Sequence, residues 1–319
     1  PCAPMLVDIN VNGRAVKALA QPTKQSILYV FNRVTGEPIW PIEEKPVPKG
    51  DVPGEWYSPT QPFPAKPPPY GRSGFSPNDV LDFTPQLKQE ALQFISKFRI
   101  GPVFTPPVVS KPGGPLGTLD IGCCQGGTSW PGGSWDPQTH LLYVYGKTEV
   151  SSLGLVPPEK GKSDMNFVRG SAAPTGPLTV EGLPLVKPPY GAITAINLDK
   201  GEIVWQVPHG ETPDNVRNSP ALRGLRIPRT GRAGNIGIVT TATLVISGEA
   251  GFVTNEQGQR GAWLRAYDKA TGKDAGAVFM PAGETGSPMT YMHNGKQYIV
   301  LAVGGAGFPA ELLAYRLPD

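Results

Sequence analysis

Lys24 is the residue of this 319-residue sequence whose chemistry first draws attention. It lies in Ala20-Gln21-Pro22-Thr23-Lys24-Gln25, directly before an apolar run over 27–31 that predicts a strand. If the fold is circular, a lysine at the start of an inner strand points toward the axis, where ligands usually bind. The simpler interpretation is a solvated lysine at the edge of a strand, and the spacing alone favours it.

A second candidate is the glycine-rich run Gly126-Gly127-Thr128-Ser129-Trp130-Pro131-Gly132-Gly133. Glycines allow the backbone to come close to a flat partner, and the indole of Trp130 offers a stacking face. Turn geometry alone explains the same glycines equally well. Both hypotheses, a ligand-binding loop and a plain turn, stay open.

The remaining reactive residues give weaker signals. Cys123 and Cys124 are adjacent, which allows a strained disulfide in an oxidising compartment, although two buried free thiols are the safer interpretation. His140, His209 and His293 lack metal-ligand spacing, so we interpret each as a surface histidine or one satisfied within a turn. The sequence contains no nucleophile elbow, phosphate loop or paired zinc motif, and we predict no metal ligand in it.

A repeated segment indicates which elements position these residues. Val30–Trp40 has Gly six and Trp ten positions after its first residue, and Ala195–Trp205 keeps the same offsets. Ala266–Gly272 repeats the first part, but Gly276 stands where Trp is expected. Each copy follows an apolar strand and turns on Asp or Asn, Thr and Gly. This pattern is typical of β-propeller blades, whose Trp docks between neighbouring sheets, although a β-sandwich with similar turns remains the alternative.

Turn chemistry and composition support an all-β fold. Asn12-Gly13 and Asn294-Gly295 each separate two apolar runs, and this pair favours the type I′ turn of a hairpin. The chain has 40 Gly and 38 Pro, which is close to excluding a helical bundle because proline breaks helices. We therefore predict an all-β protein, a β-propeller, over residues 1–319.

A segment of different character interrupts the repeats at about 41–118. Residues 41–80 contain 11 prolines and should run extended or as polyproline over the surface. Ser76-Pro77 and Thr84-Pro85 each combine an N-cap residue with proline, which predicts two short helices. After Thr84 one helical face is apolar, so we expect an insertion packed on the propeller; that face consists of Leu87, Ala91, Phe94, Ile95 and Phe98.

Charge and hydropathy exclude two classes of partner. The net charge is +3 without a long basic run, so nucleic acid is not an expected partner. No apolar stretch approaches the roughly 18–20 residues of a membrane-spanning helix. The sequence starts with Pro and carries no signal-peptide pattern, which indicates a mature product or a piece of a longer chain.

Taken together, several blocks of the sequence resemble the membrane-type glucose and alcohol dehydrogenases that use pyrroloquinoline quinone (PQQ). The resemblance covers essentially the whole chain. The blocks that carry it are Leu6–Asn12, Thr23–Gln25, Tyr29–Trp40, Ser58–Phe63, Phe104–Pro107, Gly126–Pro137, Leu264–Gly272, Pro281–Gly283, Ser287–Tyr291 and Asn294–Tyr298.

The resemblance implies the C-terminal half of an eight-bladed quinoprotein propeller, with PQQ near the axis and a Ca²⁺ ion beside it. It also implies that a small alcohol or sugar is oxidised at a hydroxyl and that electrons pass to ubiquinone or a cytochrome. In relatives, the aspartate thought to act as general base and the Ca²⁺ ligands precede the match to Pro1 and Pro4. We therefore expect the isolated chain to be inactive without the N-terminal half of the propeller. The family implies a periplasmic location, with a membrane anchor upstream as one option.

Individual roles follow from the same resemblance. Lys24 matches the cation that hydrogen-bonds the ortho-quinone oxygens, where a fixed ammonium stabilises the charge left by an arriving hydride. Trp130 matches a Trp over the cofactor, and Ser129 stands where many relatives have Asn. Asn235-Ile236-Gly237 matches a segment near a PQQ carboxylate. The family's adjacent cysteines lie elsewhere, so Cys123 and Cys124 receive no role.

Two other function classes compete with the dehydrogenase. One is a non-catalytic propeller that binds protein partners, as scaffolds with PQQ-type repeats do. The other is a sugar-binding propeller that has lost its cofactor, for which the missing Trp at Gly276 and the unusual Ser129 leave room. Lys24 and the insertion at 41–118 favour the dehydrogenase, because a scaffold needs neither.

Overall fold

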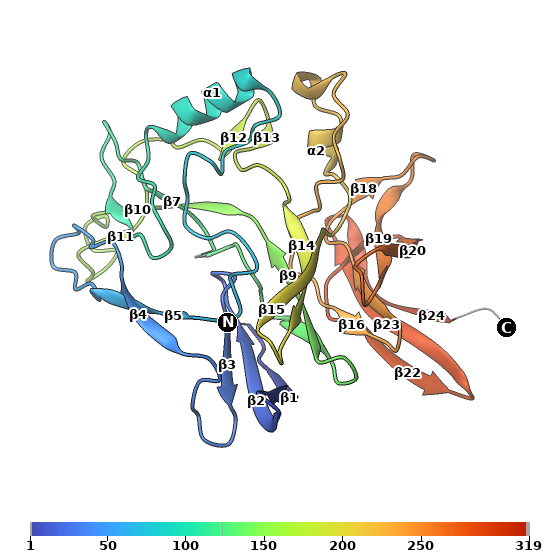
Figure 1. Ribbon diagram of the computed structural model, residues 1–319. Helices are drawn as coiled ribbons and strands as arrows, with labels where there is room; N and C mark the ends of the chain where they lie inside the picture. Colours follow the sequence, from blue (N-terminus) through green and yellow to red (C-terminus); the bar gives the residue numbers. More distant parts are fainter. Residues whose placement is uncertain (1, 123, 317–319) are drawn as a thin grey trace.

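The computed structural model describes residues 2–122 and 124–316, and four antiparallel sheets follow one another across it (Figure 1). The first blade contains β1 (Met5–Val11), β2 (Arg14–Pro22) and β3 (Leu28–Asn32). The second contains β8 (Gly133–Asp136), β9 (Leu141–Lys147), β14 (Gly191–Asn197) and β15 (Glu202–Pro208). The third contains β16 (Val239–Thr240), β17 (Leu244–Gly248), β19 (Arg260–Asp268) and β20 (Asp274–Met280), with β18 (Val253–Thr254) beside β19. The fourth contains β21 (Gly283–Glu284), β22 (Met289–His293), β23 (Lys296–Gly305) and β24 (Phe308–Arg316).

The sheets are arranged as blades around a common inner side. β1 packs on β8 and β8 packs on β16, so the first strands of successive blades face one another. A separate group of buried apolar side chains packs within each interface between neighbouring blades. The all-β propeller architecture predicted from the repeats is confirmed.

The predicted hairpins are confirmed as well. Asn12 and Gly13 have φ angles of 52° and 76°, and Asn294 and Gly295 have φ angles of 49° and 73°. Both central residues of a type I′ turn need positive φ, which Asn and Gly tolerate best. These tight turns lie at the lower end of the blades in Figure 1, whereas the long loops lie at the upper end.

The repeated segments occupy the same register in their blades. Ala195 pairs with Trp205 on one side and Tyr143 on the other, and Ala266 likewise pairs with Gly276 and Ile246. A register shift follows at the same place in both blades, after Ala195 and after Ala266. The repeat seen in the sequence is therefore a repeat of structure.

The tryptophans dock between blades as predicted. A Cβ added at Gly201 would lie 2.9 Å from the ring of Trp40, and one added at Gly272 would lie 2.7 Å from the ring of Trp205. The turn glycines of the second and third repeats thus receive the indole of the preceding blade, and any larger residue at either position would displace the ring.

The insertion carries one of its two predicted helices. It holds β4 (Ile42–Pro46), β5 (Thr60–Pro64), α1 (Pro85–Ile95), β6 (Val108–Val109) and β7 (Thr118–Ile121). In α1 the Thr84 side chain caps the backbone N–H of Leu87 at 3.2 Å, as the sequence predicted. The helix expected at Ser76-Pro77 is wrong. There the Asp79 carboxylate accepts hydrogen bonds from the Ser76 backbone and hydroxyl, which closes a single turn instead.

A second excursion, which the sequence did not suggest, lies between β9 and β14. It holds β10 (Val150–Val156), β11 (Val168–Arg169), β12 (Thr179–Val180) and β13 (Leu183–Pro184). β10 pairs with β6 and β7 of the insertion, so the two excursions share strands. They also share one apolar core, which includes residues near α2 (Asp214–Arg217) and the 3-10 turn Pro220–Leu222.

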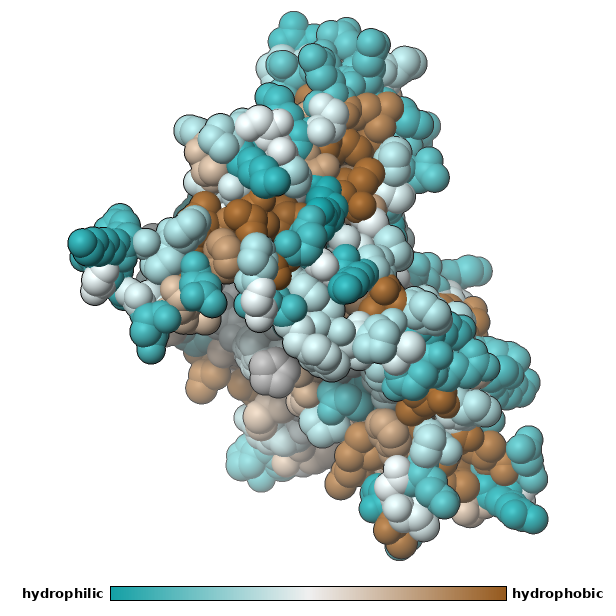
Figure 2. Space-filling view, turned by 90° about the vertical axis from the view of Figure 1, so that its left-hand side faces the viewer, coloured by the Kyte–Doolittle hydropathy of each residue, from teal (hydrophilic) through white to brown (hydrophobic). Residues whose placement is uncertain are grey.

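On the side of the molecule with β4 and β5, apolar residues gather in patches separated by hydrophilic ones (Figure 2). Between β4 and β5, the side chain of Trp56 is 81% exposed. Among the helices of the described residues, none has the length and apolar character needed to cross a membrane.

Candidate functional site

Lys24 lies in the turn between β2 and β3, at the loop-bearing end of the first blade. The prediction that it starts an inner strand is wrong, because β1 takes the inner position and β3 is the third strand outward. Its Nζ lies 3.3 Å from Ser129 Oγ, and the side chain is half-buried. Within residues 2–122 and 124–316, no carboxylate lies within ion-pair distance of this ammonium.

The glycine-rich loop packs directly against the Lys24 turn. Gly127 exchanges backbone hydrogen bonds with Lys147, and a Cβ at Gly127 would collide with the backbone of Lys24. A Cβ at Gly122 would also lie 2.8 Å from the Lys24 carbonyl oxygen. These two glycines therefore serve close packing of the chain on itself. Ser129 and Trp130 are the part of the loop that remains accessible, since the Trp130 side chain is 50% exposed.

Thr128 fixes the position of this loop through hydrogen bonds. Its hydroxyl donates to the Tyr145 carbonyl at 2.8 Å and accepts from the Tyr70 hydroxyl at 2.7 Å. Its backbone N–H donates to Thr23 at 3.2 Å, and the Cys2 thiol donates to its carbonyl at 2.9 Å. Burial raises the pKa of Tyr70 well above its ordinary value, so this phenol stays a neutral donor. Sequence reasoning missed Thr128 and Tyr70, because their contact spans two distant segments.

Asn235, Ile236 and Gly237 lie directly before β16 of the third blade. Ile236 is buried and the Gly237 N–H donates to the Glu284 carboxylate, so only Asn235 presents an exposed side chain. No direct contact joins this segment to Lys24 in the described chain. Tyr145 connects the two regions, because its carbonyl accepts from Thr128 and its hydroxyl donates to the Arg232 carbonyl.

Glu284 is a residue that sequence reasoning missed. It is 3% exposed, and its two oxygens accept hydrogen bonds from the backbone N–H groups of Gly237 at 2.5 Å and Gly248 at 2.6 Å. Burial raises the pKa of Glu284 to about 8, because no cation lies beside it among the described residues. The carboxyl holds together the Asn235–Gly237 segment, the end of β17 and the start of β21. Its long-range partners leave no local signal in the sequence.

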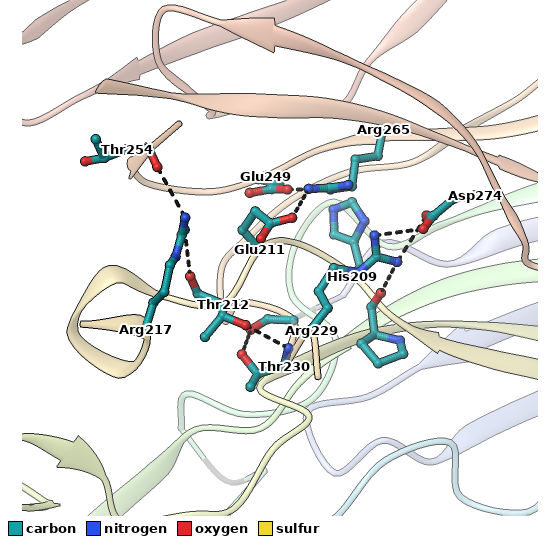
Figure 3. Close-up of polar contacts among 12 residues, drawn as sticks. His209, Glu211, Thr212, Arg217, Arg229, Thr230, Glu249, Thr254, Arg265 and Asp274 are labelled. Atoms are coloured by element: carbon teal, nitrogen blue, oxygen red, sulfur yellow. Dashed lines mark hydrogen bonds and ion pairs between the residues drawn. The ribbon is translucent and has the colours of Figure 1, made fainter. Parts of the chain in front are cut away.

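A second polar cluster lies at the third blade, and its charges are paired (Figure 3). Arg265 Nε contacts Glu249 at 2.5 Å, and Arg265 Nη2 contacts Glu211 at 2.6 Å. Although burial alone lowers it, the two carboxylates raise the pKa of Arg265 above its ordinary value. Arg229 forms a forked pair with Asp274 nearby.

The histidines behave as satisfied residues. His209 Nε2 lies 3.1 Å from the Gly248 carbonyl and must donate to it, so Nδ1 accepts from the Tyr267 hydroxyl at 2.9 Å. Burial lowers the pKa of His209 to about 4, which keeps the ring neutral. His209 is 1% exposed, so it is a buried histidine whose ring nitrogens are both hydrogen-bonded, and the interpretation as a surface histidine is wrong. His140 pairs with Asp199 at 2.9 Å, and His293 is exposed.

Two further predictions concern the adjacent cysteines and the absence of metal ligands. Cys124 is exposed, so the prediction of two buried thiols is wrong for this residue. Cys123 lies outside the described residues, and a disulfide between the two cysteines stays a prediction. In the described part of the chain, no group of three or more His, Cys, Asp or Glu side chains could hold a metal ion.

The family follows from comparison with known proteins. Residues 1–299 match the family described as glucose/ethanol/alcohol dehydrogenase, beta-propeller domain, of the PQQ type. This chain belongs to that family. The resemblance inferred from the sequence blocks is thereby confirmed.

Individual relatives agree with this assignment. The chain is 31% identical to the glycerol dehydrogenase large subunit of Gluconobacter thailandicus, covering 97% of this chain and 44% of that protein. It is 29% identical to the quinoprotein glucose dehydrogenase of Escherichia coli K12, covering 100% of this chain and 41% of that protein. The chain thus spans about two fifths of the length of the curated relatives it matches.

A solved structure supports the fold. The quinohemoprotein alcohol dehydrogenase of Pseudomonas putida HK5 superposes with a TM-score of 0.52 and 18% identity, over 95% of this chain and 34% of that one. The family uses PQQ, a flat and anionic quinone, and the accessible groups fit such a molecule. They are the Lys24 ammonium, which has no carboxylate partner in the described part of the chain, the Ser129 hydroxyl, the exposed Trp130 ring and the exposed Asn235 amide.

Proposed function

We propose that the full-length protein is a PQQ-dependent dehydrogenase that oxidises a hydroxyl of a small alcohol or aldose, and that this chain supplies the Lys24 side of its active site. The observation that carries the proposal is the half-buried Lys24 ammonium. Its hydrogen-bond partner is the neutral Ser129 hydroxyl at 3.3 Å, so its positive charge is not neutralised within the described chain.

PQQ, when bound, supplies the electrophilic carbonyl carbon that accepts hydride from the substrate. Lys24 would hold the bound quinone by donating hydrogen bonds to its oxygens, and its ammonium would stabilise negative charge on them. The Ser129 hydroxyl holds the ammonium in place from one side. The position of both groups is fixed by Thr128, whose hydrogen bonds tie the loop to the Lys24 turn.

Trp130 and Asn235 have auxiliary roles in this proposal. The exposed indole of Trp130 would offer a stacking face to the flat cofactor, and the exposed Asn235 amide could donate to one of its carboxylates. Ile236 and Gly237 contribute by holding Asn235, because Ile236 is buried and the Gly237 N–H is already bound to Glu284.

Other parts of the protein complete the site. We assign the general base and the Ca²⁺ ligands to the N-terminal half of the same propeller, since the described residues of this chain contain no metal-ligand cluster. Ubiquinone or a cytochrome would serve as the electron acceptor of the complete enzyme. The expected compartment is the periplasm, where PQQ enzymes meet these acceptors.

Reconstitution of the full-length protein tests the proposal. PQQ and Ca²⁺ are added to the apoprotein, and the reduction of an artificial dye is measured with a panel of alcohols and aldoses. We expect dye reduction that requires PQQ, Ca²⁺ and at least one of these substrates. If PQQ neither binds nor supports reduction with any of them, the dehydrogenase is excluded and a protein-binding scaffold becomes the better function.

A further inference from the structure

The spaces between neighbouring blades, which we call slots, differ in how they are filled. In the first slot Trp40 packs on Gly201, and in the second Trp205 packs on Gly272. Trp205 Nε1 also donates to the Lys269 carbonyl at 3.1 Å, and the ring lies 5.6 Å from that of Tyr143. Each of these two slots is therefore occupied by an indole that the chain itself provides.

In the third slot, between the third and fourth blades, no such indole is found among the described residues. The strand positions that carry Tyr143 and Trp205 in the second blade carry Ile246 and Gly276 in the third. A cavity of about 570 Å³ lies in their place. Its walls are largely apolar and come from both blades; they include Ile246, Leu264, Gly276, Val278, Ile299 and Tyr315.

The two blades that border the third slot are joined by contacts at their upper end. Glu284 of β21 accepts hydrogen bonds from Gly237 and Gly248 of the third blade, and its own N–H donates to the Glu249 carbonyl. A buried apolar group that includes Met280 packs against the same junction. These contacts join the third and fourth blades at one end of the slot.

The cavity opens to solvent on its outer side. Val278, which lines it, is 49% exposed, and the β20 residues from Asp274 to Val278 are all exposed. Its volume falls within the roughly 300–1,000 Å³ of small-molecule sites. A small molecule from solution can therefore reach it.

We propose that the third slot binds a small molecule through a planar aromatic ring system of about the size of indole. In the two equivalent slots the protein places the indole side chains of Trp40 and Trp205. The walls of the third slot offer apolar area and the Tyr315 ring for stacking. The site is remote in the fold from the Lys24 turn, since it lies between the last two blades, and it is independent of the proposed reaction.

Indole itself is the probe for this site. Isothermal titration calorimetry and thermal unfolding followed by circular dichroism are carried out on the full-length protein with increasing indole. We expect saturable binding and a rise of the melting temperature by about 2 °C or more at saturation. Cyclohexylmethanol, which has no planar ring, should bind at least about tenfold more weakly.

Matched variants decide where indole binds. Gly276 has a φ of 142°, a region that favours glycine, so replacing it directly would disturb the strand. Ile246→Phe instead fills the slot from its floor, and Val204→Phe adds the same side chain at an exposed position of β15 outside the slot. We expect the first variant to weaken indole binding at least about tenfold and the second to leave it unchanged.

Three results would overturn the proposal. Absence of indole binding would mean that the slot is closed or covered, by another segment of the polypeptide or by a second copy. Equal binding of indole and cyclohexylmethanol would show that the slot does not select a planar ring. Unchanged binding in folded Ile246→Phe would place the indole elsewhere.

Discussion

Lys24 and Arg265 are both cations at the loop-bearing end of the propeller, but their surroundings are opposite. Arg265 is buried between two carboxylates, Glu249 at 2.5 Å and Glu211 at 2.6 Å. Lys24 is half-buried and meets a neutral hydroxyl at 3.3 Å. The charge of Arg265 is therefore neutralised within the fold, whereas the charge of Lys24 is available to a ligand in the proposed function.

The comparison has an energetic meaning. A buried ion pair is costly to break, because removal of one partner leaves the other charge buried and alone. A cation without a carboxylate partner contributes little to folding, so its placement reflects another requirement. Loss of the Arg265 side chain should therefore lower stability more than loss of Lys24, whereas loss of Lys24 should lower activity more.

Loss of Arg265 should have the largest effect on stability. Arg265→Met keeps much of the side-chain length but leaves Glu249, which is 1% exposed, without its cation. We expect the free energy of unfolding to fall by about 3–5 kcal/mol in urea titrations. A fall below about 1 kcal/mol would show that the Arg265–Glu249 ion pair does not stabilise the fold. The contrast between Arg265 and Lys24 would then not hold.

Glu284 offers an intermediate case, a buried carboxyl with no cation beside it among the residues that the structure describes. Its pKa in the folded state is about 8, against 4.5 for the ordinary value, so the folded protein binds a proton that the unfolded chain releases. Stability from this group is complete below pH 4.5 and is lost as the pH rises to 8, by on the order of a few kcal/mol. Glu284→Gln cannot ionise, so it should lack this loss.

Unfolding of both proteins at pH 5 and pH 8 measures the effect. The wild type should lose stability relative to Glu284→Gln between these values. A constant difference between the two proteins would mean that Glu284 does not titrate in this range.

The hydrogen bonds of the Thr128 hydroxyl, which join neutral groups near Lys24, should stabilise the fold less than the Arg265 ion pairs do. Thr128→Val keeps the shape of the side chain but removes the hydroxyl that binds Tyr70 and Tyr145. We expect a loss of about 1–3 kcal/mol in unfolding free energy. Thr128→Ser keeps the hydroxyl and is the control; if it is destabilised as much as the Val variant, the hydroxyl is not the cause.

Local patterns allowed much of the fold to be predicted. The Asn-Gly turns, the Trp repeat and the Thr84 cap each depend on residues within one segment, and all three are confirmed. The prediction of a helix at Ser76 was wrong because the Ser76 backbone N–H and hydroxyl donate to the Asp79 carboxylate in a single turn. The excursion between β9 and β14 left no signal, since its strands are short and pair with a distant insertion.

The candidate site was predicted less completely. The resemblance pointed to Lys24 and Ser129, and the structure brings them together. The position of Lys24 beyond the inner strand, the Thr128 contacts and the Glu284 clamp depend on residues far apart in the sequence. Such contacts are set by how blades pack, which no local spacing records.

The most direct test of the central claim is Lys24→Met in the full-length protein, with PQQ and Ca²⁺ at saturation. We expect kcat to fall by about 10²–10³-fold, because the charge that stabilises the quinone oxygens is lost. The unfolding free energy should change by no more than about 0.5 kcal/mol, since within residues 2–122 and 124–316 the ammonium has no ion pair to break. A kcat within about twofold of the wild type would remove Lys24 from the reaction. A loss of stability as large as that of Arg265→Met would instead make it a structural charge.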